Sequence, residues 1–305
     1  MRNQERRSNV TKDLVLPSTE SPGRKIARNP NEWGGGVLNK NLLSRSSIES
    51  FRRQYQTAEP FPHIVFQNLF SDDFLESLLE DFDHIGFGDW LRYDTSNEVK
   101  FATRPGAKLG PSSQTYMDVI HRGSFMTFLS DVTGVAGILP DPMLFGGGLH
   151  EIPAGGKFGV HTDFNRHPVT RLDTRLVFLT YLNKDWDASY GGALELWDRS
   201  TNRCVQQVVP HFGTSILFGH SADSLHGHPI PVQTPDGRSR RSIAAYFYTN
   251  GRPDPVDDEF RTTHFHQPLE TGRFGRVANS VKYFVPPAFV DAGKRIRRGL
   301  MKLKP

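Results

Sequence analysis

The sequence predicts a mainly β fold with flanking helices (α+β), in which short strands form a β-sandwich or jelly roll. Several short segments in its second half are rich in apolar residues, and turns containing glycine and proline separate them. Two stretches before them repeat apolar residues at helical spacing. Short strands joined by such turns are typical of sandwiches and jelly rolls. With 305 residues, 36% of them hydrophobic, the chain can bury one large core.

The first half of the chain is expected to provide helices that buttress the sheet. Ser71 and the two aspartates after it form a helix start signal, and apolar residues then recur at helical spacing through Phe82. The same spacing predicts a helix over residues 123–132, and a short one is expected over residues 46–55. Between them, residues 86–116 are rich in glycine, proline and charge. We expect a long loop there, over the mouth of a cavity.

Strands are predicted from residue 60 onward. The segment after Pro60 indicates a first strand that ends by Phe70. Four further strands are predicted where apolar runs follow charged or glycine-containing turns. They cover residues 171–183, 190–198, 213–218 and 241–248.

Two close residues and a distant pair of histidines have the residue types of a metal site. His161 and Asp163 are two apart, so on extended backbone both side chains point to the same side. His226 and His228 lie more than sixty residues later and share that spacing. Two neutral imidazoles and one carboxylate on one face of an octahedral ion leave three positions open, the arrangement found in non-haem Fe(II) oxygenases.

The third ligand stays open between the two distal histidines. Both could point inward from an extended strand, and either could complete the set. The local sequence Ser-Leu-His-Gly favours His226. His228 would then be a hydrogen-bond partner of a ligand or a substrate contact.

An arginine follows the distal histidines at a distance that suits a carboxylate anchor. Arg240 offers a planar fork that matches a carboxylate, and Ser242, two residues on, would add a hydroxyl from the same side of a strand. Arg175 and Tyr181 are further candidates for contact with a substrate or with the groups around the metal. Arg175 can equally be read as a solvated strand end, and Tyr181 as lining of the core.

Taken in order, these motifs resemble the iron- and 2-oxoglutarate-dependent oxygenase superfamily in its prolyl 4-hydroxylase-like branch. The resemblance covers about residues 58–252. It implies a double-stranded β-helix, the jelly roll of cupin-like proteins, with Fe(II), the co-substrates 2-oxoglutarate and O2, and ascorbate as an optional further cofactor. The motifs that carry it are His161-Thr162-Asp163-Phe164, Leu179-Thr180-Tyr181-Leu182-Asn183, Gly191-Gly192-Ala193-Leu194, Pro210-His211-Phe212-Gly213, Leu225-His226-Gly227 and Arg240-Arg241-Ser242-Ile243.

The resemblance implies a role for each motif residue. His161, Asp163 and a histidine near 226 would hold the iron, and Arg240 would bind 2-oxoglutarate. The expected reaction is hydroxylation of an unactivated C–H bond in a prolyl residue, a free amino acid or a small metabolite, with succinate and CO2 as co-products. The alternatives are a nucleic-acid-directed oxygenase or demethylase and a binding module that keeps the fold without catalysis.

Charge and composition bear on those alternatives. The formal net charge is +4, and basic residues concentrate at the two ends of the chain. Such runs are more often solvated tails than nucleic-acid sites, and no zinc-finger spacing or phosphate-binding loop accompanies them. We therefore expect a small-molecule or peptidyl substrate rather than nucleic acid.

Three regions are expected along the chain. A polar arm would span residues 1–45, and an oxygenase domain residues 46–255, with helical support over 46–135 and the jelly-roll core over 136–255. A C-terminal extension with a basic helix would span residues 256–305. The single cysteine, Cys204, excludes an internal disulfide, and neither a secretion signal nor a transmembrane run is apparent, so we expect a cytoplasmic protein. The sequence leaves the oligomeric state open.

Overall fold

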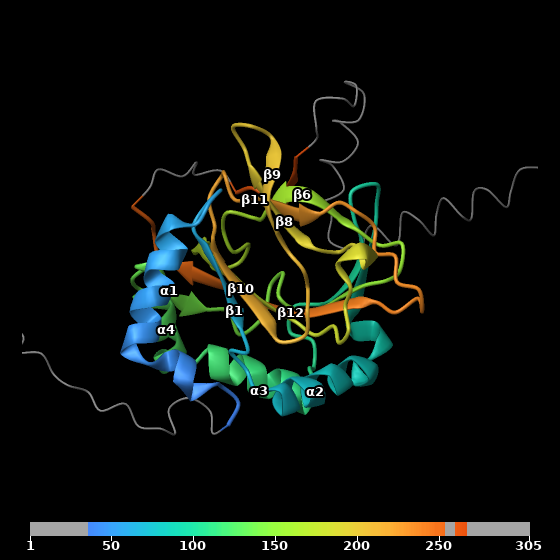
Figure 1. The fold of residues 1–305 in the computed structure, drawn as a ribbon, viewed down its shortest axis with the longest axis horizontal. Coiled ribbons are helices and arrows are strands. Elements are labelled where there is room, and N and C mark those ends of the chain that lie inside the picture. Colours follow the sequence, from blue (N-terminus) through green and yellow to red (C-terminus); the bar gives the residue numbers. More distant parts are fainter. Residues whose placement is uncertain (1–35, 254–259, 267–305) are drawn as a thin grey trace, which may run out of the picture.

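Two antiparallel sheets face each other in a jelly roll, with helices packed along one side (Figure 1). The structure is a computed structural model that describes residues 36–253 and 260–266. The larger sheet has eight strands, in the order β1-β10-β7-β12-β5-β3-β2 with β4 paired to β12. The smaller sheet has five strands, in the order β13-β6-β11-β8-β9.

Most strands of both sheets are short, as predicted, and only β7 and β12 are longer. Those of the larger sheet are β1 (His63–Gln67), β2 (Trp90–Asp94), β3 (Val99–Thr103), β4 (Leu139–Pro140), β5 (Gly148–Ile152), β7 (Asp173–Tyr181), β10 (Thr214–Gly219) and β12 (Arg240–Thr249). Those of the smaller sheet are β6 (Phe158–Thr162), β8 (Leu194–Asp198), β9 (Arg203–Val208), β11 (Leu225–His228) and β13 (His264–Phe265).

The described part of the chain has four α-helices, which lie before the middle of the sequence and cover the outer face of the larger sheet (Figure 1). Three of them were predicted, whereas the helix at Pro111–Ile120 was not. The apolar cluster between them and the sheet joins Phe125 and Phe128 of one helix to Phe178 of β7 and Leu217 of β10. The helices are α1 (Arg45–Thr57), α2 (Asp72–Glu80), α3 (Pro111–Ile120) and α4 (Gly123–Thr133), with short 3-10 turns at Lys40–Leu43, Asp81–His84, Phe87–Asp89 and Ala188–Tyr190.

The strand β7 is buried on both faces because it separates the helices from the interior of the jelly roll. Leu176 and Phe178 belong to the cluster under the helices, whereas Val177 and Tyr181 belong to a second cluster between the sheets. Successive side chains of a strand point to opposite faces, which explains why this strand reads as an almost continuous apolar run.

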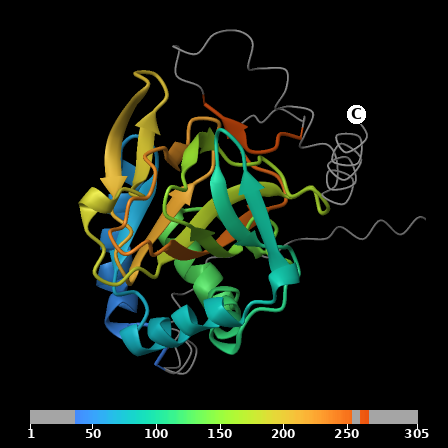
Figure 2. The same cartoon turned by 90° about the vertical axis from the view of Figure 1, so that its right-hand side faces the viewer.

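The prediction of a long loop over residues 86–116 is wrong. The segment contains β2 and β3, which form a hairpin that pairs with β5, and it ends in the first turns of α3. Figure 2 shows this hairpin in teal on the side of the jelly roll that faces the viewer. Its sequence is polar because β2 lies at the edge of the sheet and is largely exposed or half-buried.

The part of the expected polar arm that the structure describes is packed. Leu38 forms an isolated bridge with Phe70, and both Leu38 and Leu43 are buried in the cluster under the helices. The rest of the arm, the basic helix expected near the C-terminus and most of the extension lie outside the described residues. Within the described ranges, no helix combines the length and the apolar character that a membrane crossing needs.

Candidate metal centre and its surroundings

Three buried side chains of the predicted metal motif lie together between the sheets. His161 on β6 is directly opposite His226 on the neighbouring strand β11, and Asp163 follows one residue after β6 ends. One potential ligand atom from each of the three lies within 4.8 Å of the others. Neighbouring residues of a strand pair have side chains on one face, so the pairing of β6 with β11 brings the two imidazoles together.

Hydrogen bonds to the backbone orient both imidazoles toward the carboxylate. The Nδ1 of His161 bonds to the carbonyl of Gly159 at 2.8 Å, and the Nδ1 of His226 bonds to the carbonyl of Ser224 at 2.9 Å. Because a carbonyl only accepts, each Nδ1 carries the proton and each Nε2 presents a lone pair. This is the tautomer that a metal ligand requires.

The distances in the cluster suit a metal ion. His161 Nε2 lies 3.3 Å from Asp163 Oδ1, and His226 Nε2 lies 3.4 Å from Asp163 Oδ2. Atoms about 2.1 Å from one ion and at right angles around it lie about 3 Å apart. The Nε2 of His161 and the Oδ2 of Asp163 are buried without a hydrogen-bond partner, so a cation bound here would satisfy them.

The electrostatics of the cluster favour the protonation states that bind a metal. Burial lowers the pKa of His161, and the neighbouring His226 lowers it further, so its imidazole stays neutral. Burial alone would raise the pKa of Asp163, but His226 and His161 outweigh it and hold that pKa well below its usual range. The site therefore offers a neutral imidazole from His161 and an ionised carboxylate from Asp163.

Aromatic rings enclose the cluster. The ring of Phe158 stacks on His161 with centroids 3.9 Å apart, and Phe265 of β13 lies 5.7 Å from the same imidazole. Phe218 of β10 lies 4.6 Å from His226. These rings fix the imidazoles and keep water away from them.

A β-bulge explains how Phe158 comes to stack on a residue three positions away. His226 pairs with His161, whereas His228 pairs with Phe158, so the ladder advances by two residues on β11 and by three on β6. The additional residue in β6 brings Phe158 to the same face as His161. The sequence motif carries no sign of this bulge.

His228 points into the same interior but does not belong to the three-residue cluster. It is buried beside Phe158, and neither of its ring nitrogens has a hydrogen-bond partner. Burial lowers its pKa well below the usual range, and the cations Arg240 and Lys100 lower it further. Among the described residues both ring nitrogens are without a hydrogen-bond partner, so this uncharged imidazole can bind a ligand that enters the interior.

The predicted carboxylate anchor is buried in the interior as well. Arg240 donates from Nε to the carbonyl of Gly192 at 2.7 Å, and its guanidinium lies 4.8 Å from the centroid of the Tyr181 ring. Within the described ranges the buried Tyr181 hydroxyl meets no hydrogen-bond partner, and Ser242 lies directly beside Tyr181 in the pairing of β12 with β7. No carboxylate is paired with Arg240 among the described residues, so its remaining N–H donors can bind an anion.

Arg175 does not join this group. It lies near the start of β7, six residues before Tyr181, and donates a hydrogen bond to Thr249 at 3.3 Å. Its contact with a substrate stays a prediction.

Sequence reasoning missed Lys100, His150 and Tyr246. Lys100 lies in the segment expected to be a loop, and His150 lies on β5, which was not predicted. Tyr246 has Asp163 near its hydroxyl, and burial together with this carboxylate raises its pKa well above the usual value. Alternation from Arg240 through Ser242 would have placed Tyr246 on the inner face.

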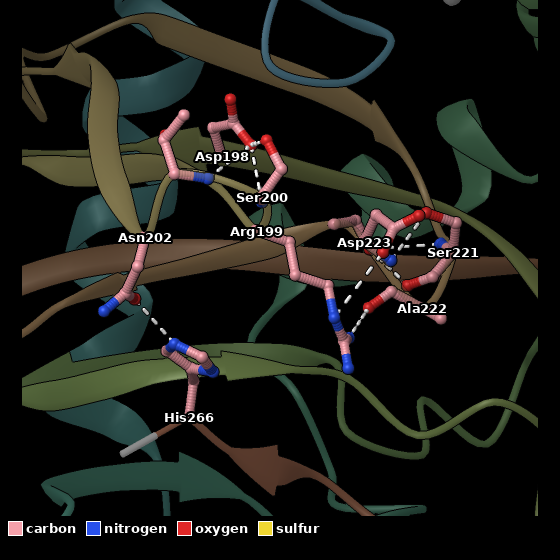
Figure 3. A network of polar contacts seen from close by, with 10 residues as sticks. Asp198, Arg199, Ser200, Asn202, Ser221, Ala222, Asp223 and His266 are labelled. Atoms are coloured by element: carbon pink, nitrogen blue, oxygen red, sulfur yellow. Dashed lines mark hydrogen bonds and ion pairs between the residues drawn. The ribbon is translucent and has the colours of Figure 1, made fainter. Parts of the chain in front are cut away.

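Polar contacts outside the cavity hold the turn that leads into β11 (Figure 3). Arg199, in the turn after β8, donates to the carbonyl of Ala222 and pairs with Asp223. His266, just after β13, hydrogen-bonds with Asn202 at 2.7 Å. These contacts tie the turn between β8 and β9 to the approach to His226 and to the segment that covers β6.

Comparison with known proteins finds similarity around this site. Residues 147–248 match the family model described as the 2OG-Fe(II) oxygenase superfamily. The match covers about a third of the chain and includes the three residues of the cluster, Tyr181, Arg240 and Ser242.

Individual relatives are more distant. A curated protein from Xenopus laevis, named Prolyl 3-hydroxylase OGFOD1, is 22% identical over 194 residues, which are 62% of this chain and 35% of that protein. The chain thus spans about a third of that relative's length. A solved prolyl-4-hydroxylase from Pseudomonas putida is 16% identical, with a TM-score of 0.48 over 67% of this chain and 100% of that chain. A prolyl hydroxylase from Trichoplax adhaerens, solved with a hypoxia inducible factor peptide fragment, is 15% identical. Its TM-score is 0.46, over 67% of this chain and 93% of that chain.

Proposed function

We propose that this protein is an iron- and 2-oxoglutarate-dependent hydroxylase in which His161, Asp163 and His226 hold the iron. The observation that carries the proposal is the convergence of their buried ligand atoms within 4.8 Å. They share this interior with the guanidinium of Arg240, which pairs with no carboxylate among the described residues. A metal site alone is compatible with many reactions. The buried arginine adds a specific requirement for a carboxylate co-substrate.

The residues of the chain would bind, orient and shield the reactants. Arg240 would pair with the distal carboxylate of 2-oxoglutarate, and Ser242 and Tyr181 would contribute hydroxyl groups beside it. Phe158 and Phe265 would exclude water around His161. Bound iron would supply the oxidising chemistry at the substrate C–H bond.

We propose a peptidyl or free amino acid as the substrate, with a prolyl residue as the first candidate. The name of the Xenopus laevis relative supports a prolyl substrate, although this chain covers only 35% of that protein. The aromatic rings around the cluster offer apolar surface that suits an aliphatic ring. The cytoplasmic location and the use of ascorbate stay predictions.

Succinate formation tests the proposal. Iron-loaded protein would be incubated with 2-oxoglutarate and a panel of proline peptides, free amino acids, small metabolites and modified nucleotides. We expect one amino-acid or peptide member to raise succinate release above the substrate-free rate and to gain 16 mass units. Asp163→Ala should abolish both signals, whereas Asp187→Ala, which changes an exposed carboxylate, should retain them.

Two results would reject this function. Succinate release stimulated by a modified nucleotide alone would favour the nucleic-acid-directed alternative. Iron-loaded protein that releases no succinate with or without any panel member would favour a binding module.

A further inference from the structure

Cross-strand pairing places a row of polar side chains next to the predicted co-substrate residues. Ser242 on β12 lies opposite Tyr181 on one neighbouring strand and opposite His150 on the other. Side chains of directly opposed residues share a face. His150 therefore extends the row of Tyr181 and Ser242 by one strand.

A second row of side chains lies on the same face, two residues farther along each strand than the first row. This second row has a cation at each end. Arg240 on β12 lies opposite Ile152 on β5. β3 pairs with β5 through Phe101 and Ala102, so Lys100, the next residue along β3, lies beside Ile152 on the same face. Arg240 and Lys100 are thus two strands apart, about 10 Å between their backbones, with both side chains directed to the interior.

Lys100 is buried, and it has more N–H donors than oxygen acceptors among the described residues. Its side chain is only 10% exposed, and its Nζ lies 3.3 Å from Glu98. The same nitrogen lies 3.5 Å from the centroid of the Phe158 ring and 4.9 Å from that of Tyr93. Three N–H donors thus meet one oxygen partner and two ring faces among the described residues. Burying an ammonium in this way is costly unless a further acceptor binds to it.

Several polar atoms between the two cations also have no hydrogen-bond partner among the described residues. They are His150 Nε2, the Tyr181 hydroxyl and both ring nitrogens of His228. Arg240 and Lys100 both lower the pKa of His150, which burial has already lowered most, to about 3. His150 is therefore an uncharged hydrogen-bonding group between two positive charges.

The strand that carries Lys100 is fixed to both sheets. At the turn before β3, Val99 donates to the carbonyl of Lys157, and Gly159 donates to the carbonyl of Asn97. These bonds join the hairpin to β6, the strand of His161, while β3 itself pairs with β5. Lys100 is consequently held at the junction between the metal strand and the row of Arg240.

We propose that Lys100 and His150 are further 2-oxoglutarate-binding residues, with Lys100 directed to the carboxylate remote from Arg240. The inference rests on the proposed function and deepens it, because a dicarboxylate places one anionic end near each cation. Glu98 acts as the counter-ion of Lys100 before the ligand binds. His150 contributes an uncharged hydrogen bond between the two ends.

Binding measurements on full-length protein loaded with Mn(II) test the proposal without turnover. Calorimetry would compare 2-oxoglutarate with 2-oxobutyrate, a 2-oxo acid that has no distal carboxylate. We expect Lys100→Met to weaken both ligands about tenfold, and His150→Ala to weaken both by about threefold. Arg240→Met should weaken 2-oxoglutarate strongly and 2-oxobutyrate little. Lys184→Met, at a half-exposed lysine paired with Glu76, serves as the matched control and should bind both ligands as the unaltered protein does.

The metal content and melting temperature of each variant would be measured alongside, so that a folding defect is not mistaken for lost affinity. The proposal would be overturned if both variants, Lys100→Met and His150→Ala, were folded and metal-loaded and bound both ligands with unchanged affinity. Loss confined to 2-oxoglutarate in Lys100→Met would overturn the assignment to the remote carboxylate. If the unaltered Mn(II) protein bound neither ligand, the proposed function would fail and this inference with it.

Discussion

His226 and His228 are two residues apart on one strand, yet they have different neighbours. His226 faces His161 across the strand pair and approaches Asp163, while His228 faces Phe158. The carbonyl of Ser224 fixes the ring of His226, whereas no described group bonds to the ring of His228. Only His226 is both close to the carboxylate and held in the tautomer that a metal needs.

We therefore expect His226→Ala to lose nearly all bound iron. His228→Ala should keep close to one iron per chain, because its ring is outside the cluster. Iron content after anaerobic loading and desalting, measured by atomic absorption, distinguishes the two variants. The reverse result would make His228 the third ligand.

At the level of single residues, sequence reasoning predicted the neighbours within one strand better than the contacts between strands. Spacing alone predicted that His161 and Asp163 approach each other, and the structure places them 3.3 Å apart, although Asp163 lies just past the strand end. It favoured His226 from the local sequence but left His228 open as the third ligand, because alternation directs both side chains inward. Lys100 was missed because its contacts depend on tertiary pairing between segments far apart in the sequence.

Among the elements, the pairing of β6 with β11 determines the geometry of the metal cluster. The two backbones approach closely at Gly227, where an added Cβ would lie 2.7 Å from the carbonyl oxygen of Gly159 and 2.9 Å from that of Phe158. Both atoms belong to the backbone, so they can move only if β6 moves. Gly227 is thus needed for the spacing of His226 from His161.

Gly227→Ala should accordingly weaken metal binding by more than about tenfold and lower the melting temperature by several degrees, since overpacking of this kind costs roughly 1–3 kcal/mol. Gly88→Ala is the matched control, because an added Cβ meets no atom within 4 Å there. Titration with Mn(II) and thermal unfolding measure the two effects. Equal metal affinity in both variants would show that the strand spacing does not control the site.

The hairpin of β2 and β3 shows why an element can be missed from sequence. Strands were predicted where apolar residues concentrate, and this held for β7 and β10, which are largely buried. In β2 the two exposed positions carry charged residues, Arg92 and Asp94, and in β3 a lysine, Lys100, occupies a buried position. A charged residue at a buried strand position interrupts the apolar pattern, so the segment was predicted to be a loop.

Across the whole molecule, metal binding should stabilise the fold, because the ligands come from two strands that are far apart in sequence. At a free Mn(II) concentration of 100 times Kd, the stabilisation is about 2.7 kcal/mol, which corresponds to about 5–10 °C in melting temperature for a domain of this size. Differential scanning calorimetry with and without Mn(II) measures the shift. Asp163→Ala should show no such shift, and an equal shift there would place the bound ion elsewhere.

Buried neutral histidines should make the metal-free protein sensitive to acid. His150 has a pKa of about 3 in the folded chain, below the roughly 6.5 of an unfolded histidine. The unfolded state therefore takes up a proton first, and stability falls as pH drops below about 6.5. For His150 alone we expect a loss of about 2 kcal/mol in the free energy of unfolding between pH 7 and pH 5.

Urea unfolding at the two pH values measures this loss. His150→Asn should reduce the pH dependence by about that amount, whereas His264→Asn, at an exposed position, should leave it unchanged. A pH dependence that is the same in both variants would mean that His150 is not the source.

The jelly roll itself was the most predictable property of the molecule, because it depends on the number of short strands and the turns between them. The exact pairing order was not, since β5, β9 and β13 have few apolar residues or only two positions. The β6 bulge and the covering of β6 by β13 arise from tertiary pairing, for which one sequence gives no local signal.

The short strand β13 has a consequence for the behaviour of the chain in concentrated solution. Without it, β6 would be the outermost strand of the smaller sheet and would present unpaired N–H and C=O groups beside the metal cluster. Such an edge is a template for pairing with another chain. Two residues of β13 and the bond from His266 to the carbonyl of Val160 occupy that edge, so the segment that packs Phe265 against His161 also guards the protein against edge-to-edge aggregation.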